Sequence, residues 1–213
     1  MRVLKTMITV VLASFLLAGC GAKSSRLAQP VPVEKGAPVV HIHPLTDTHR
    51  QARVGVLPFQ VPARMGEAQA SGVAALYKEV LLGKRTFPVV MELATPYSDI
   101  ESAVEIGRKQ GVDLVLAGRV DYCLDGGDLG GARVGVTVRL VSTATGNTVW
   151  YVSQTMDQPM DYPDVSFLNR LATSFSIPAY RGSNGAPAVP NMLARIAVDM
   201  AEVFAGAQYV ARR

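Results

Sequence analysis

All three histidines of this 213-residue chain fall in one short stretch, HIHPLTDTH, as His41, His43 and His49. Imidazole nitrogens at this spacing could ligate a transition metal. The flanking residues are rich in Pro and Gly and offer neither a hydrophobic shell nor partners that would orient metal ligands. We favour the alternative of a polar linker with incidental histidines. Because no histidine then remains for the folded part of the chain, we expect no Ser-His-Asp or Cys-His catalytic arrangement there.

A second group of chemically active residues comprises Asp121, Asp125 and Asp128, around the sequence DGGDLGG. Their carboxylates could bind Ca²⁺ or serve acid–base chemistry. The spacing D-x-x-x-D-G-G-D matches no calcium loop that we can name, and Asp and Gly are common in turns that bind nothing. A strand rather than a helix is expected after the glycines, so they do not form a phosphate cradle. We therefore expect no metal, no cofactor and no catalytic residue here.

The most specific chemical signal is a cysteine at the end of an apolar run near the N-terminus. The run from Met7 to Gly19 is shorter than the roughly 20 residues that a membrane-spanning helix needs. The basic residues Arg2 and Lys5 precede it, as in a secretory signal. The sequence Leu17-Ala18-Gly19-Cys20 resembles the bacterial lipobox, in which the chain is cut before the cysteine and the cysteine is acylated. An ordinary signal that happens to contain a cysteine is the alternative.

We therefore predict a lipoprotein signal peptide over residues 1–19, cleavage between Gly19 and Cys20, and lipidation of Cys20. Several acyl chains on one residue make a durable membrane anchor. Gly21 follows the cysteine where an Asp would favour retention in the inner membrane, so we expect the periplasmic face of the outer membrane. If Cys20 carries lipid, Cys123 has no partner within the chain, and we expect its thiol to be buried rather than paired between chains.

Loss of the signal also changes the charge of the chain. The full sequence has 21 Lys and Arg against 17 Asp and Glu, a formal net charge of +4. Because Arg2 and Lys5 leave with the signal, that net charge is halved. We find no block of basic residues with interleaved aromatics, so we expect no nucleic-acid partner.

The elements that would carry these residues follow from hydrophobic periodicity. Residues 20–52 are rich in Pro, Gly and Ser and are predicted to form a flexible tether. Beyond them, apolar or alternating runs predict strands, and apolar residues at helical spacing predict helices. One helix has an S-x-x-E capping box at Ser98 and Glu101 and a stop at Gly111, and Gly83 should end another. Predicted strands span 52–61, 86–93, 112–124, 132–142 and 147–156, and predicted helices span 68–82, 98–111 and 190–210.

This order of elements predicts one α/β domain over residues 53–213, a three-layer-like sandwich in which helices pack on a mixed sheet of about five strands. The first three strands should be parallel and the last two should form a meander. Residues 157–189 are an irregular insertion, in which 165–175 could form a short helix. Its aromatic residues could pack on their own domain, or they could bind a partner protein; these candidate partner-binding residues are Tyr162, Phe167, Phe175 and Tyr180.

Three stretches of sequence resemble a known family. VGVLPF, GVDLVLAGRV and VTVRLVSTATGNTVWY are similar to the domain shared by CsgG, the N-terminal part of TolB, PelC, LpoB and FlgO-type envelope lipoproteins. The resemblance covers most of residues 53–156 and the final helix. It implies a TolB N-terminal/CsgG-like fold, a location on the periplasmic face of the outer membrane and no enzymatic activity. The matching residues are Gly111-Val112-Asp113, Gly118, Thr145-Gly146 and Trp150.

The resemblance also implies a class of function. Such proteins assemble into rings or bind partner domains in secretion, polysaccharide export, flagellar or peptidoglycan-synthesis machinery. We find no pair of long alternating strands of the kind that CsgG-like pores insert into a membrane, so we do not expect a self-made pore. Our first hypothesis is a self-associating accessory subunit of a secretion, polysaccharide or appendage export machine. The alternative is a tethered monomer that activates a periplasmic cell-wall-synthesis enzyme; a hydrolase or metal enzyme is disfavoured.

Overall fold

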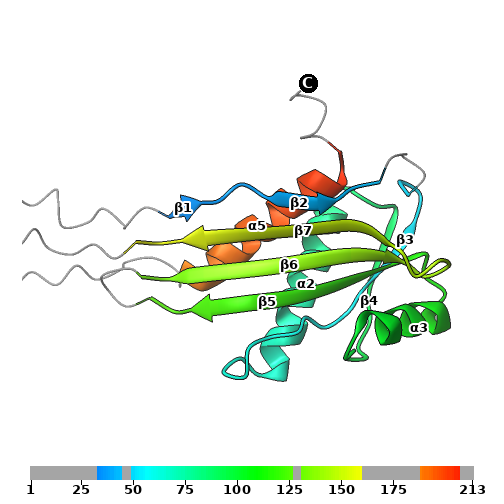
Figure 1. Ribbon diagram of the computed structural model, residues 1–213, viewed down its shortest axis with the longest axis horizontal. Helices are drawn as coiled ribbons and strands as arrows, with labels where there is room; N and C mark the ends of the chain where they lie inside the picture. Colours follow the sequence, from blue (N-terminus) through cyan, green and yellow to red (C-terminus); the bar gives the residue numbers. More distant parts are fainter. Residues whose placement is uncertain (1–32, 45–48, 127–130, 160–187, 207–213) are drawn as a thin grey trace, which may run out of the picture. The chain divides into compact units, whose positions relative to one another are not determined.

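A seven-stranded mixed sheet forms the centre of the computed structural model, which describes residues 33–44, 49–126, 131–159 and 188–206 (Figure 1). Strand β3 (Arg53–Val56) lies between β4 (Val89–Glu92) and β5 (Leu114–Leu124), and the three are parallel. Strands β6 (Arg133–Ser142) and β7 (Thr148–Asp157) follow β5 as an antiparallel meander. The predicted directions of these five strands are confirmed.

Helices cover both faces of this sheet. α2 (Glu67–Gly83) and α5 (Ala188–Phe204) pack on one face over the larger core, and α3 (Ile100–Gln110) packs on the other over a smaller core (Figure 1). Because successive strand residues point to opposite faces, β5 contributes Leu114 and Leu116 to the larger core and Val115 and Ala117 to the smaller one. The predicted α/β sandwich is confirmed. None of the helices in the described part of the chain has the length and hydropathy of a membrane span.

The segment that pairs with the outer edge of β7 corrects the prediction of a flexible tether over residues 20–52. Residues 34–42 fall in the segment predicted to be a tether, yet β1 (Glu34–Lys35) and β2 (Val39–Ile42) pair antiparallel with β7. The backbone groups along that edge would otherwise lack partners from the sheet, which favours pairing with any nearby extended segment. Gly36 separates the two strands and donates its amide to Thr155 O at 3.1 Å. A Cβ at Gly36 would lie 2.7 Å from that oxygen, so the close approach requires glycine.

The ends of two helices also differ from the predictions. The N-cap of α3 is Asp99 rather than Ser98: its carboxylate accepts the Ser102 amide at 2.8 Å, and this bond is the main reason that the pKa of Asp99 is lowered. α2 runs through Gly83, and the residue in the left-handed conformation after it is Arg85, with φ of 52°. There the Thr86 amide donates to Leu81 O at 3.0 Å, which makes the turn a Schellman motif with arginine at the position that usually holds glycine.

Gly72→Ala is expected to raise the free energy of unfolding by about 0.5–1 kcal/mol, because glycine in a helix interior loses more backbone entropy on folding than alanine. Gly72 is exposed in the middle of α2, and an added Cβ would meet no atom within 4 Å. Chemical denaturation followed by circular dichroism measures the change. Gly107→Ala in α3 is the matched control and should destabilise, since its Cβ would lie 2.4 Å from Val115 Cγ1. A loss of stability in Gly72→Ala would contradict the prediction.

Candidate functional site

Several of the residues that the sequence singles out lie outside the described residues. Among them are Gly19 and Cys20, the predicted cleavage and lipidation site, and Asp128. The helix expected over 165–175 also lies outside the described residues. So do the four candidate partner-binding aromatics, Tyr162, Phe167, Phe175 and Tyr180. These assignments stay predictions.

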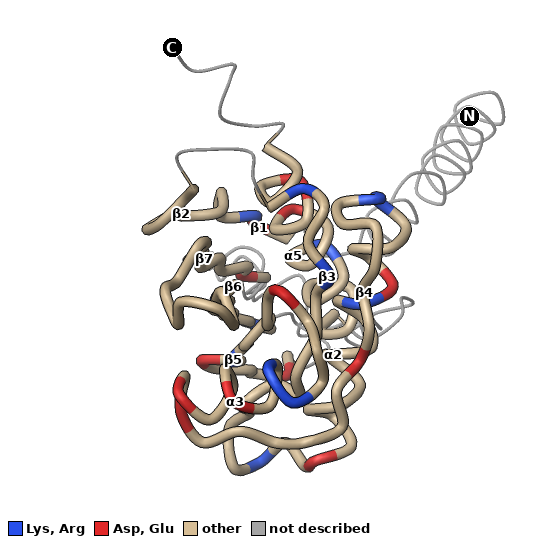
Figure 2. The backbone as a smooth tube through the Cα atoms, turned by 90° about the vertical axis from the view of Figure 1, so that its right-hand side faces the viewer, with Lys and Arg blue, Asp and Glu red and all other residues tan. Residues whose placement is uncertain are grey.

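Of the other two aspartates of the predicted cluster, Asp121 forms hydrogen bonds on the surface of the sheet and Asp125 is exposed to solvent. The carboxylate of Asp121 accepts Arg119 Nε at 2.7 Å and Thr137 Oγ1 at 2.5 Å, which links β5 to β6. Asp125 is exposed just beyond the end of β5. Within the ranges that the structure describes, no three His, Cys, Asp or Glu side chains are placed to hold a metal ion. Figure 2 shows basic and acidic residues interspersed along the backbone in the view it gives.

Cys123 is only half-buried and packs against the larger core from the end of β5. Burial raises the pKa of its thiol, and Asp125 raises it further, while Arg64 lowers it. A raised pKa keeps the sulfur in the less reactive thiol form. The thiol expected to be buried is thus only partly so.

The histidines correct the prediction of a linker with incidental histidines, because the rings of His41 and His49 pack on aromatic residues of the folded domain. The His41 ring stacks on Tyr151 with centroids 4.5 Å apart, and its Nε2 lies 2.9 Å from Ser153 Oγ. On the same ring of Tyr151, the guanidinium carbon of Arg139 lies 4.4 Å from the centroid. This Ser–His pair lies on an exposed face of the sheet rather than in a cavity, and no carboxylate of the described residues is recorded as a partner of His41. It lacks the third, orienting group of a hydrolase triad.

His43 and His49 line a cavity of about 440 Å³ at the end of the sheet. Part of its wall is aromatic: Trp150 meets Phe204 edge-on at a centroid distance of 5.9 Å and Phe87 at 6.2 Å. His49 approaches the same indole at 5.8 Å. Trp150 is 7% exposed and comes from β7.

The polar lining of this cavity is basic. Its charged and ionisable residues are His43, His49, Arg50 and Arg85, and no Asp or Glu is among the described residues that line it. Thr86 also lines the cavity, and its buried hydroxyl has no hydrogen-bond partner among the described residues. An unsatisfied buried hydroxyl is costly and calls for an explanation. We name this site, defined by the residues of this paragraph and the three aromatics above, the basic cavity.

A separate polar cluster joins the N-terminal strand to the last helix. Asp199 of α5 is 5% exposed, and its two carboxylate oxygens accept Lys35 Nζ and Gln154 Nε2, each at 2.6 Å. The same Gln154 amide donates to Gly36 O at 2.9 Å. Asp199 also adds to the effect of burial in raising the pKa of Tyr77, whose hydroxyl donates to Met200 Sδ. We call Lys35, Gly36, Gln154 and Asp199 the strand clamp, because together they hold β1 against β7.

Sequence reasoning missed both the basic cavity and the strand clamp. The cavity draws on residues from distant parts of the chain that show no common motif. The clamp did leave a signal: Asp199 falls on the apolar stripe of a predicted helix, between Ile196 and Met200, and Gln154 falls on the inward face of a predicted strand. A polar side chain in such a place usually has a buried partner.

Among known proteins, this chain is similar to solved structures only. No family model matches the sequence, and no curated protein matches it. The PelC dodecamer from Paraburkholderia phytofirmans is similar at 19% identity and a TM-score of 0.46, over 79% of this chain and 96% of that one. Lipoprotein GNA1162 from Neisseria meningitidis is similar at 18% identity and a TM-score of 0.37, over 58% of this chain and 92% of that one.

The C-terminal domain of LpoB from Salmonella enterica is also similar, at 12% identity and a TM-score of 0.40, over 53% of this chain and 88% of that one. PelC and LpoB are two of the proteins that share the domain named in the sequence resemblance. Structures of both, and of lipoprotein GNA1162, are among those similar in fold to this chain.

Proposed function

We propose that this protein is a lipid-anchored envelope protein that works by binding other proteins, as a self-associating accessory subunit of a secretion or export machine. In this proposal Cys20 holds the domain at the periplasmic face of the outer membrane, and the domain itself carries out no catalysis. The lipobox-like sequence before Cys20 supports the anchor.

The observation that carries self-association is that both terminal strands of the sheet have open outer edges in the described part of the chain. At one end is β2, where the apolar side chains of Val39 and Ile42 are 54% and 41% exposed, and at the other is β4, where Val89 is 39% exposed. An open edge presents unpaired backbone groups to another chain. Two different edges on one chain suit a head-to-tail contact, which closes into a ring when the rotation between copies allows it.

The mass of the purified chain from Gly21 onward, measured by light scattering over a range of concentrations, tests self-association. We expect a discrete oligomer. Replacing Val39 and Ile42 with lysine should yield a monomer with unchanged circular dichroism, because charge on an edge strand opposes pairing. Leu82→Lys on α2, which is 39% exposed, is the matched control and should leave the mass unchanged. A strict monomer at high concentration would contradict the proposal and favour the tethered activator of a cell-wall-synthesis enzyme.

A further inference from the structure

The lining of the basic cavity suits an anion that carries an apolar group. Arg85 and His49 contribute basic side chains to the lining, while His43 and Arg50, which also line it, already interact with other groups. The rings of Trp150, Phe87 and Phe204 supply an apolar surface beside them. A volume of about 440 Å³ is that of a typical small-molecule site, which combines an apolar lining with a few polar groups. We propose that the basic cavity binds an amphipathic phosphate ester, with the phosphate at Arg85 and the apolar part on the aromatic rings.

The backbone at Arg85 supports this proposal independently of the cavity's lining. Arg85 has a φ of 52° at the end of α2, a conformation that glycine adopts without steric cost and other residues adopt unfavourably. The sequence places a glycine two residues earlier, at Gly83, where φ is not positive. Arginine at this position therefore supplies a side chain that glycine would lack, and it does so at the cost of local backbone strain. Such strain is concentrated at functional sites.

Thr86, the next residue, adds a second local feature. It lines the cavity, is 9% exposed, and its hydroxyl has no partner among the described residues. Because the hydroxyl oxygen is itself buried, the side chain would have to turn about χ1 toward the cavity to donate to a phosphate oxygen, in addition to the guanidinium group of Arg85. The phosphate could belong to a lipid headgroup or to a soluble ester, and the test below separates these sources. The proposal does not depend on self-association or on lipidation of Cys20.

Trp150 makes the proposal directly testable, because it is the chain's only tryptophan and lines the cavity. Its fluorescence in the full chain is followed during titration with inorganic phosphate, phenyl phosphate, benzyl alcohol, and dihexanoyl phosphatidylglycerol below its micelle-forming concentration. We expect a saturable change with at least one of the two esters, and weaker or no binding of inorganic phosphate and benzyl alcohol. A response to the phospholipid identifies a headgroup site, and a response to phenyl phosphate alone identifies a site for soluble esters.

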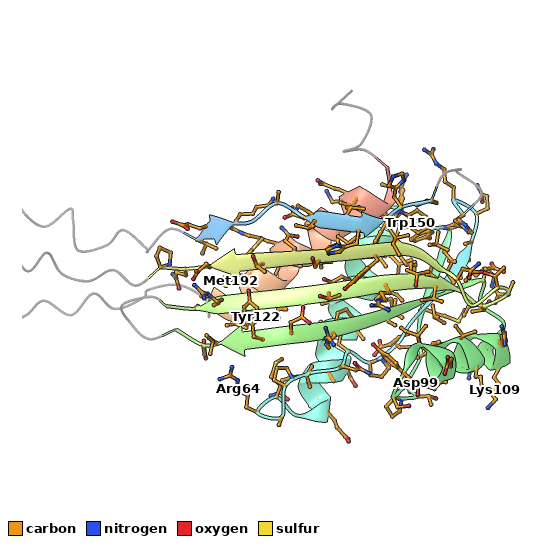
Figure 3. All side chains as sticks on the ribbon, viewed as in Figure 1. Arg64, Asp99, Lys109, Tyr122, Trp150 and Met192 are labelled. Atoms are coloured by element: carbon orange, nitrogen blue, oxygen red, sulfur yellow. The ribbon has the colours of Figure 1, made fainter. Side chains whose placement is uncertain are left out.

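Arg85→Gly is the decisive variant. It should weaken ester binding by about tenfold, the effect of losing one charge-assisted hydrogen bond. It should not lower thermal stability, since glycine suits the left-handed position, so lost binding cannot be attributed to unfolding. Arg64→Gly removes the same charge from a loop that lies far from Trp150 in Figure 3 and should bind as the unmodified chain does. The proposal is overturned by unchanged affinity in Arg85→Gly, by no saturable response to either ester, or by equal binding of inorganic phosphate or benzyl alcohol.

Discussion

Gly118→Ala is expected to lower the free energy of unfolding by about 2–3 kcal/mol, because it forces an extra methyl group into a packed core. A Cβ at this position of β5 would lie 2.2 Å from Cε1 and 2.3 Å from Cζ of Phe59. The Phe59 ring is 2% exposed and packs on the Tyr77 ring with centroids 4.7 Å apart, so either the ring or the strand must shift. Chemical denaturation followed by circular dichroism measures the loss.

A double-mutant cycle with Phe59→Leu identifies the cause of this loss. If the ring is what excludes a side chain, Gly118→Ala should cost at least about 1 kcal/mol less in the Phe59→Leu background. An equal cost in both backgrounds would contradict the clash. The carbonyl of Gly118, which accepts Tyr97 Oη at 2.8 Å and the Gln60 amide at 2.9 Å, would then be the sensitive group.

Asp199→Ala is the second change with a large expected effect, about 2–4 kcal/mol of lost stability. The substitution leaves Lys35 without its ion-pair partner and removes one acceptor from the Gln154 amide, which is 2% exposed. Because both partners belong to the strand clamp, β1 should loosen from β7 before the rest of the sheet does. Hydrogen exchange of the Gly36 amide, which donates to Thr155 O, is expected to accelerate more than exchange within β6.

Lys84→Ala is the matched control for this prediction. Lys84 follows α2 and pairs at 2.8 Å with Glu202 of α5, the helix that also carries Asp199. The side chains of Lys84 and Glu202 are 41% and 37% exposed. An exposed pair contributes little, so this variant should lose less than about 1 kcal/mol and leave exchange of the Gly36 amide unchanged. If Asp199→Ala behaved like Lys84→Ala, the strand clamp would not hold β1.

Local periodicity was sufficient to predict most of the fold. The predicted helix over 68–82 differs by one residue at each end from the observed Glu67–Gly83, because its apolar stripe is a property of consecutive residues. The strand predicted over 52–61 is too long: regular pairing with both neighbours ends at Val56, since Pro58 cannot donate to a ladder. Motif residues were informative because they serve the fold. Asp113 accepts the Arg53 amide at 2.8 Å, and Gly111 takes the left-handed φ of 65° that ends α3.

The remaining features depend on residues that are distant in the sequence. β1 and β2 were missed because Gly36 and Pro38 break any alternation, and their pairing comes from the open edge of β7 rather than from their own pattern. The basic cavity was missed for the same kind of reason. Its histidines precede the first strand of the predicted domain, Arg85 ends a helix, and Trp150 lies on the last strand of the meander, so only the folded chain brings them together.

The pairing of β1 with β7 determines how far the domain could stand from a lipid surface. If Cys20 is acylated, about 14 residues separate the lipid from Glu34, which at full extension reach roughly 50 Å. A free chain from Cys20 to Arg53 would reach about twice that distance. The effective concentration of a tethered domain falls roughly as the −3/2 power of linker length, so releasing β1 and β2 would dilute the domain about threefold to fourfold near its anchor. With Cys20 acylated, one ion pair, Lys35 with Asp199, would thereby help to set the local concentration of the domain near its anchor.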